Sequence, residues 1–319
     1  MANERWILSI DGGGSKTDLL LLDTIARRGF IVTGNGTNPN VYGQNGIRDL
    51  ENLIGQVLSR ASCDAADVEA CVVGMAGISN RKYKPALETM LETTFAASDV
   101  NLTSDAELAH HSIWRGNPGI TLIAGTGSIV IGIDSEGRLH RAGGVGFTAG
   151  DEGSGYWLGK SILTQLITNE RSSDEDVVEL KEAVSEFFGK TEFEEVLQSV
   201  SLLRGTVSSV AAVAPIVLSI AESENFLASQ VVSHGAEKLA EMVEEVSEKM
   251  GLKAESLSLG CCGSLIKQSL FYRDQVEEFL LLSYADVEWV TDDHLPVFGG
   301  LALMDTDIDE WSQLDIEHV

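Results

Sequence analysis

The stretch Asp11-Gly12-Gly13-Gly14-Ser15-Lys16-Thr17 lies between two apolar segments, Trp6–Asp11 and Asp18–Asp23, that have the pattern of β-strands. Its three glycines permit a sharp turn and let backbone amides approach an anion, while the hydroxyl groups and the lysine add donors and a positive charge. It is not a P-loop, because GxxxxGK[ST] is absent and a strand follows. The stretch predicts a phosphate-binding hairpin, with a ligand-free glycine turn as the alternative.

A second glycine turn, Gly125-Thr126-Gly127-Ser128, joins the strand-like segments Ile120–Ala124 and Ile129–Asp134. It occupies the same place in a second unit as the first loop does in the first, which indicates an internal duplication. One such loop is weak evidence for a ligand. Two loops in equivalent positions predict a clamp on both sides of a polyphosphate.

The rest of the chain alternates in the order of an α/β protein with mixed sheets. The first third contains further strand patterns and helical spacing, at 29–33, 46–60, 70–75, 84–95, 100–103 and from 106. Residues 154 to about 250 are mostly helical, and strands return around 256–259 and 287–290. The breaker-rich run Arg115–Gly119 predicts domains at 1–114 and 115–319, with a last helix at about 297–312 that could pack back on the N-terminal domain.

Composition restricts the partners. The 319 residues include 22 Lys and Arg against 49 Asp and Glu, a formal net charge of −27, which argues against binding nucleic acid or anionic membranes. The four cysteines form no CxxC pair, and the N-terminus has the pattern of a strand rather than of a signal peptide. The stretch Thr206–Ala221 is short for a membrane span. We therefore expect a cytoplasmic protein.

Asp105 follows the short strand pattern Asn101–Ser104 and begins a helical pattern. As a structural residue it would cap that helix. As a functional residue, a carboxylate at a strand end between the two phosphate loops could act as a general base and accept a hydroxyl proton.

These motifs, together with the stretch Gly150-Asp151-Glu152-Gly153-Ser154-Gly155-Tyr156-Trp157, resemble the BadF/BadG/BcrA/BcrD ATPase family over nearly the whole chain. Within that family the sequence is most similar to the N-acetylglucosamine kinase branch of the actin-like sugar kinases. The resemblance implies an α/β fold with two ribonuclease H-like, actin-like ATPase domains, mixed sheets and an interdomain cleft. It also implies ATP and Mg²⁺ as cofactors, an amino sugar as substrate and a homodimer.

The resemblance also implies roles for single residues. Asp105 would be catalytic, and Asp11 would organise Mg²⁺ through water. The residues that would bind the nucleotide are Gly12, Gly13, Gly14, Ser15, Lys16, Thr17, Gly125, Thr126, Gly127, Ser128, Gly263 and Ser264. The residues near the sugar would be Asn38, Asp105, Gly144, Asp151 and Glu152, although Glu152 could equally be a buried pair partner. Ala211–Ala221 would flank the base.

One departure concerns the sugar. The family's usual Gly-Trp-Gly is Gly144-Val145-Gly146 here, and Phe147 could substitute for the missing ring. The expected reaction is phosphoryl transfer from ATP to a hydroxyl, at C6, of N-acetylglucosamine or a related amino sugar. The alternatives are an ATPase activator of a 2-hydroxyacyl-CoA dehydratase, which needs cysteines for an iron–sulfur cluster, and a non-catalytic sugar sensor or a filament protein.

Overall fold

A computed structural model describes residues 6–78, 80–146, 150–202, 206–252, 256–314 and 316–318. They form two compact units, of which the first comprises Met1–Asn117 and Asp292–Val319 and the second Pro118–Thr291. The chain therefore crosses between the units twice. The span 115–319 expected for the second domain differs from this division, because residues 292–319 pack within the first unit.

The first unit contains a six-stranded mixed sheet with the strand order β11-β3-β2-β1-β4-β5. Its strands are β1 (Trp6–Gly12), β2 (Lys16–Asp23), β3 (Arg28–Asn35), β4 (Val68–Met75), β5 (Asp99–Thr103) and β11 (Ile316–His318). β1, β2 and β3 pair antiparallel through hairpins, whereas β4 and β5 run parallel to β1. The carboxyl ends of β1, β4 and β5 consequently lie at one edge of the sheet.

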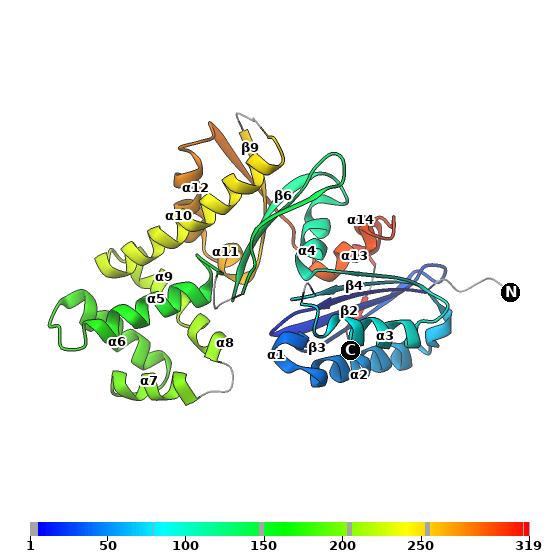
Figure 1. Cartoon of the computed structure of the whole chain (residues 1–319), viewed down its shortest axis with the longest axis horizontal. Helices are drawn as coiled ribbons and strands as arrows, with labels where there is room; N and C mark the ends of the chain where they lie inside the picture. Colours follow the sequence, from blue (N-terminus) through cyan, green and yellow to red (C-terminus); the bar gives the residue numbers. More distant parts are fainter. Residues whose placement is uncertain are drawn as a thin grey trace. The chain divides into compact units, whose positions relative to one another are not determined.

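Both faces of this sheet are covered. The unit contains α1 (Pro39–Tyr42), α2 (Gln44–Ala61), α3 (Lys84–Thr94), α4 (Asp105–Trp114), α13 (Gly299–Ala302), α14 (Ile308–Ser312) and the 3₁₀ turns Ala65–Asp67 (η1) and Pro296–Phe298 (η2). Leu8, Leu19 and Leu21 pack with α2 and α3. Ile7 and Leu20, which alternate with them along the strands, pack with the C-terminal segment. Figure 1 shows α2 and α3 on one side of the sheet and α13 and α14 on the other.

The C-terminal segment is thus part of the first core. The hydroxyl of Ser9 on β1 donates to the carbonyl of Val297 over 2.5 Å, and Leu301 and Trp311 are buried with the sheet residues. The helix expected at about 297–312 is in fact the turn η2 followed by the two short helices α13 and α14.

We expect Leu301→Ala to lower the free energy of unfolding by about 2–5 kcal/mol, because Leu301 is fully buried and its loss would leave a cavity beneath β1 and β2. Leu303→Ala is the matched control, since Leu303 is only partly buried. Urea denaturation of both variants measures the difference. Equal losses would show that the segment does not belong to the core of the first unit.

The second unit repeats the topology of the first. Its five-stranded sheet has the order β10-β9-β6-β7-β8, formed by β6 (Gly119–Ala124), β7 (Ser128–Ile133), β8 (Leu139–Gly143), β9 (Ser256–Cys262) and β10 (Asp286–Thr291). β6, β7 and β8 pair antiparallel, and β9 and β10 run parallel to β6, as β1 to β5 do in the first unit. The predicted duplication is confirmed.

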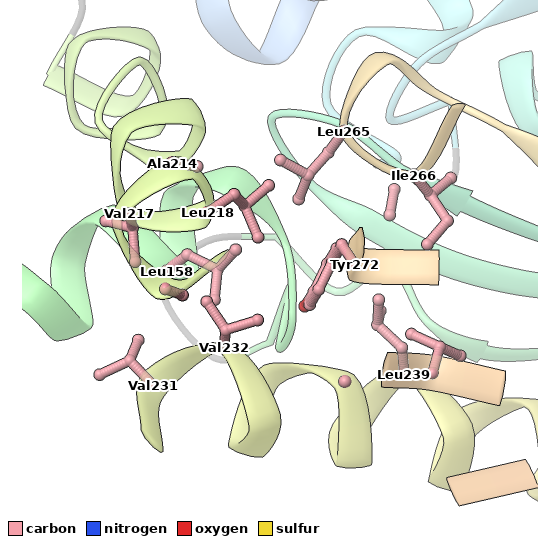
Figure 2. Close-up of a cluster of buried hydrophobic side chains, with 14 of the residues drawn as sticks. Leu158, Ala214, Val217, Leu218, Val231, Val232, Leu239, Leu265, Ile266 and Tyr272 are labelled. Carbon is pink, nitrogen blue, oxygen red and sulfur yellow. The ribbon is translucent and has the colours of Figure 1, made fainter. Parts of the chain in front are cut away.

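Helices make up most of the second unit between β8 and β9. They are α5 (Gly155–Thr168), α6 (Glu175–Phe187), α7 (Phe193–Leu202), α8 (Thr206–Ala211), α9 (Ala214–Glu222) and α10 (Phe226–Lys249); α11 (Ser264–Gln268) and α12 (Leu270–Leu280) follow β9. Their apolar faces form one core, part of which Figure 2 shows. Among the described residues, no single helix is both long and apolar enough to cross a membrane, and the only pair that passes together, Val207–Glu222 and Phe226–Lys249, is bent by 115°.

Candidate active site

The first glycine stretch forms the hairpin between β1 and β2. The amide of Gly13 donates to the carbonyl of Lys16 over 3.0 Å and closes the turn. Residues 36–38 lie against this hairpin: the amides of Thr37 and Asn38 both donate to the carbonyl of Gly13 over 3.1 Å. Gly36 is required there, because a Cβ at this position would lie 2.4 Å from the carbonyl oxygen of Gly14.

Two side chains make further hydrogen bonds in this region, one within α1 and one between α1 and the hairpin. Asn38 is the N-cap of α1 and accepts a hydrogen bond from the amide of Asn40. Tyr42, at the end of α1, donates its hydroxyl to the carbonyl of Gly14 over 2.9 Å. The first unit thereby holds the predicted sugar contact Asn38 and the predicted phosphate loop together.

Lys16 and Thr17 have partners that the sequence did not reveal. The ammonium of Lys16 lies 2.7 Å from a carboxylate oxygen of Asp18, which is almost fully buried. The hydroxyl of Thr17 is 2.8 Å from that of Thr37, and Thr17 is also buried. Part of the positive charge of Lys16 is therefore neutralised within the hairpin itself, and the Thr17 hydroxyl is hydrogen-bonded on the buried side of the loop.

Asp11 and Asp105 lie at the same edge of the first sheet. Asp11 is near the end of β1, and Asp105 follows β5, two strands away in the order β1-β4-β5. Burial, together with the negative charges of Asp105 and Asp18, raises the pKa of Asp11 to about 8, against a smaller opposite effect of Lys16. Burial also raises the pKa of Asp105, against two backbone hydrogen bonds that lower it.

Asp105 is not the cap of its helix. Ser104 is the N-cap of α4: its hydroxyl accepts from the amide of Glu107, and the carboxylate of Glu107 accepts from the amide of Ser104 in return. The structural alternative for Asp105 is therefore wrong. Asp105 occupies the first helical position, with its carboxylate beside α4's N-terminal amides.

The second glycine loop connects β6 and β7 in the second unit. The amide of Gly125 donates to the carbonyl of Gly127 over 2.9 Å, which makes the turn tight. The first amides of α5, from Gly155 and Tyr156, donate to the carbonyls of Gly125 and Thr126 over 2.8 and 3.2 Å. The stretch 150–157 is thus joined directly to the second predicted phosphate loop.

The turn at residues 151–154, which contains Asp151 and Glu152 and is called the acidic turn below, also contacts this loop. A Cβ at Gly127 would lie 2.9 Å from a carboxylate oxygen of Asp151, and the hydroxyl of Ser128 donates to the carbonyl of Glu152 over 2.7 Å. Burial raises the pKa of Asp151, although backbone hydrogen bonds from Gly146 and Ser128 oppose this. Glu152 is exposed, so its interpretation as a buried pair partner is wrong.

Residues 144–146, which depart from the family's usual Gly-Trp-Gly, lie beside this turn. The amide of Gly144 donates to the carbonyl of Ser128 over 3.0 Å. Val145, which stands where the family usually has Trp, leaves 61% of its surface exposed. Phe147 lies outside the described residues.

A pocket with a volume of about 600 Å³ opens beside the second loop, entirely within the second unit. Its walls combine small or apolar groups from α8, α9, α11 and α12 with the polar residues Glu222 and Gln268. The lining residues are Gly125, Thr126, Gly155, Ser208, Ala211, Ala212, Pro215, Leu218, Ser219, Glu222, Ser264, Leu265, Gln268, Ser269, Leu270 and Phe271. Gly263, the N-cap of α11, is next to Ser264.

Parts of three segments singled out from the sequence border this pocket: Gly125 and Thr126 of the second glycine loop, Ser264, and residues of the segment 211–221. Gly127, Ser128 and Gly263 are not in its lining. The lining residues that the sequence did not indicate are Ser208, Glu222, Leu265 and the run 268–271. The signal available for them was proximity, since Glu222 directly follows the segment expected to flank the base and 268–271 begin four residues after Ser264.

The residues at the carboxyl-terminal edge of the first sheet could hold Mg²⁺ only with water and substrate phosphates as further ligands. Among the described residues no group of three or more His, Cys, Asp and Glu side chains is arranged to hold a metal ion. Mg²⁺ requires only oxygen ligands and commonly keeps several waters, with one or two carboxylates and substrate phosphates completing its shell. The carboxylate of Asp11, close enough to Asp105 for their charges to interact, is compatible with such a site.

The cysteines do not favour an iron–sulfur centre. Cys63, Cys71 and Cys261 are buried, and Cys262 is partly buried. Burial raises the pKa of the Cys71 and Cys261 thiols, which disfavours the thiolate form that ligates iron.

Residues 8–288 match the BadF/BadG/BcrA/BcrD ATPase family. The chain belongs to this family. Among curated proteins, this family member is 26% identical over 308 residues to an N-acetylmuramic acid/N-acetylglucosamine kinase of Clostridium acetobutylicum, covering 96% of this chain and 100% of the relative. It is 24% identical over 317 residues to an N-acetyl-D-glucosamine kinase of Dictyostelium discoideum, covering 95% and 98%.

Solved structures establish the fold of this family member. A Chromobacterium violaceum protein assigned as an N-acetylglucosamine kinase superposes with a TM-score of 0.74 at 23% identity, over 95% of this chain and 99% of that one. A ROK family glucokinase from Streptomyces griseus, in complex with glucose and AMPPNP, superposes with a TM-score of 0.54 at 15% identity, over 93% and 96%. The predicted actin-like ATPase fold with two mixed sheets is confirmed.

Proposed function

We propose that this protein is an ATP-dependent kinase that transfers the γ-phosphoryl group to a hydroxyl, at C6, of N-acetylglucosamine or a related amino sugar. The observation that carries the proposal is the position of Asp105, a carboxylate with a raised pKa at the same sheet edge as Asp11 and the glycine hairpin. The full-length similarity to two amino-sugar kinases supports the choice of acceptor, and extends it to N-acetylmuramic acid.

Asp105 is the proposed general base. A carboxylate whose pKa is raised binds a proton more readily at neutral pH, so it is better suited to take one from a sugar hydroxyl. The hairpin connection through residues 36–38 would hold the sugar contact Asn38 in a constant position relative to Gly12–Thr17, the loop that we assign to the β- and γ-phosphates. Asp151, Glu152 and Gly144 are assigned to the sugar from the second unit.

The nucleotide is assigned to the second unit's pocket. Its small and apolar walls would accommodate an adenosine moiety, with Gly263 and Ser264 beside it and the loop Gly125–Ser128 toward the phosphates. When bound, Mg²⁺ would neutralise charge on the phosphoryl oxygens during transfer. Asp11 is the residue that would hold it, through water.

ADP release with Mg-ATP and a panel of acceptors tests the function. The panel contains N-acetylglucosamine, glucosamine, N-acetylmuramic acid and glucose, each assayed with and without EDTA. We expect release with at least one N-acetylated sugar and nearly none in EDTA, because Lys16 is the only basic residue in either glycine loop and is paired with Asp18. Failure with every acceptor, or substantial turnover in EDTA, would contradict the proposed function.

We also infer a cytoplasmic homodimer that binds neither nucleic acid nor membranes. The net charge of −27 supports the two exclusions, and the buried cysteines suit a reducing compartment. The dimer rests on the family resemblance alone. Light scattering of the purified protein measures the oligomeric state.

A further inference from the structure

Tyr272 joins two parts of the second unit that are distant in the sequence. It lies on the first turn of α12, is fully buried, and donates its hydroxyl to the carbonyl of Gly153 over 2.7 Å. Figure 2 shows its ring within the apolar cluster that includes Leu158 and Leu239. Burial raises the pKa of Tyr272, so the phenol keeps its proton and remains a donor.

One end of this connection is the wall of the nucleotide pocket. The three residues that precede Tyr272, Ser269–Phe271, all line the pocket. Ser269 is the N-cap of α12, and its hydroxyl accepts from the amide of Tyr272 over 3.1 Å. Leu265, another lining residue, belongs to the cluster in which the Tyr272 ring is buried. The pocket wall and the ring of Tyr272 therefore belong to one packed cluster.

The other end is the acidic turn. Gly153 follows Asp151 and Glu152 directly, and the amide of Ser154 donates back to the carbonyl of Asp151 over 3.1 Å. Gly153 has a φ of 72° and lies so close to α10 that a Cβ there would be 2.5 Å from the carbonyl oxygen of Gly235. The turn therefore has little freedom, and Tyr272 binds the carbonyl of Gly153 from within the core.

We propose that Tyr272 is a positioning residue that couples occupancy of the nucleotide pocket to the placement of Asp151 and Glu152. The coupling acts within one unit, through the wall 269–271, the phenol and the carbonyl of Gly153. The part of this proposal that concerns the sugar rests on the proposed function.

Tyr272→Phe tests the coupling, because it removes the hydroxyl and keeps the ring. Val276→Ala is the control: Val276 is fully buried one turn further along α12, so its truncation weakens the same helix without touching the hydrogen bond. We expect Tyr272→Phe to bind Mg-ADP within about threefold of the unsubstituted protein. Its kcat should fall by about tenfold, and the mutual enhancement of ADP and N-acetylglucosamine affinity, about fivefold or more in the unsubstituted protein, should approach one.

Val276→Ala should lose thermal stability but keep that enhancement. Calorimetric titration of ADP with and without sugar measures it for each protein. If Tyr272→Phe retains the full enhancement, or if Val276→Ala loses it to the same degree, Tyr272 is only a packing residue and the inference is overturned.

Hydrogen–deuterium exchange separates this outcome from failure of the proposed function. The amide of Ser154 is hydrogen-bonded to the carbonyl of Asp151 within the turn and neither residue lines the pocket, so its exchange reports on the turn without any sugar. Mg-ADP should slow this exchange in the unsubstituted protein and in Val276→Ala, but not in Tyr272→Phe. Equal slowing in all three would overturn the coupling even if every sugar is phosphorylated, whereas slowing as expected would support it even if none is.

Discussion

Replacing Asp105 by Asn is expected to lower kcat for sugar phosphorylation by about 100-fold or more, in the range of general-base losses. The substitution keeps the size of the side chain and its position at the start of α4, because Ser104 and Glu107 rather than Asp105 form the cap. Binding of ATP should be nearly unchanged, since Asp105 belongs to neither glycine loop and the pocket proposed for the adenosine moiety lies in the second unit.

Glu107→Gln is the matched control for this variant. It removes a carboxylate two residues away whose charge raises the pKa of Asp105, while an amide can still complete the capping box. We expect near-normal kcat for Glu107→Gln. Initial rates of ADP formation with saturating sugar measure both variants, and near-normal turnover of Asp105→Asn would remove Asp105 from the catalytic role.

Replacing Asp11 by Asn is expected to have two opposite effects. Activity should fall by about 10–100-fold and require more Mg²⁺, as for other residues that hold a metal through an outer shell. The metal-free protein should nevertheless become more stable at pH 8, because the substitution removes a carboxylate whose ionisation is opposed first by burial and then by the charges of Asp105 and Asp18.

The sign of the pH dependence follows from the raised pKa of Asp11, about 8 in the folded protein against 3.8 ordinarily. Between these values the folded state binds more protons than the unfolded state, so the free energy of unfolding decreases as the pH rises through this window. The stabilisation by Asn should therefore be largest at pH 8 and nearly absent at pH 4. Thermal unfolding in EDTA at several pH values measures it.

Asp23→Asn is the matched control at the other end of the same hairpin. Asp23 is also buried, but it accepts from the amides of Ile25 and Ala26 and pairs with Arg28. Its loss should destabilise the protein at pH 8. Destabilisation by Asp11→Asn as well would contradict the stated cause of the raised pKa.

Much of the fold was predictable because it depends on local patterns. The apolar runs around Gly12–Gly14 and Gly125–Gly127 identify two equivalent hairpins, and the strand orders of the two sheets agree with that duplication. β8 was not predicted, because its sequence Leu-His-Arg-Ala-Gly has little apolar alternation and is stabilised by pairing with β7. β11, three residues long, likewise depends on β3.

Part of the candidate site could likewise be predicted from the sequence, and part could not. The two glycine loops, the acid at the start of α4 and the stretch 150–157 could be recognised from the amino-acid sequence, since these need particular residue types in consecutive positions. The folded chain was needed to show that residues 292–319 complete the first core, that Lys16 is paired with Asp18, and that Tyr272 holds Gly153. The physical reason is that burial and side-chain contacts depend on which segments pack together. Local spacing records neither the burial of Asp18 beside Lys16 nor a contact between residues more than a hundred positions apart.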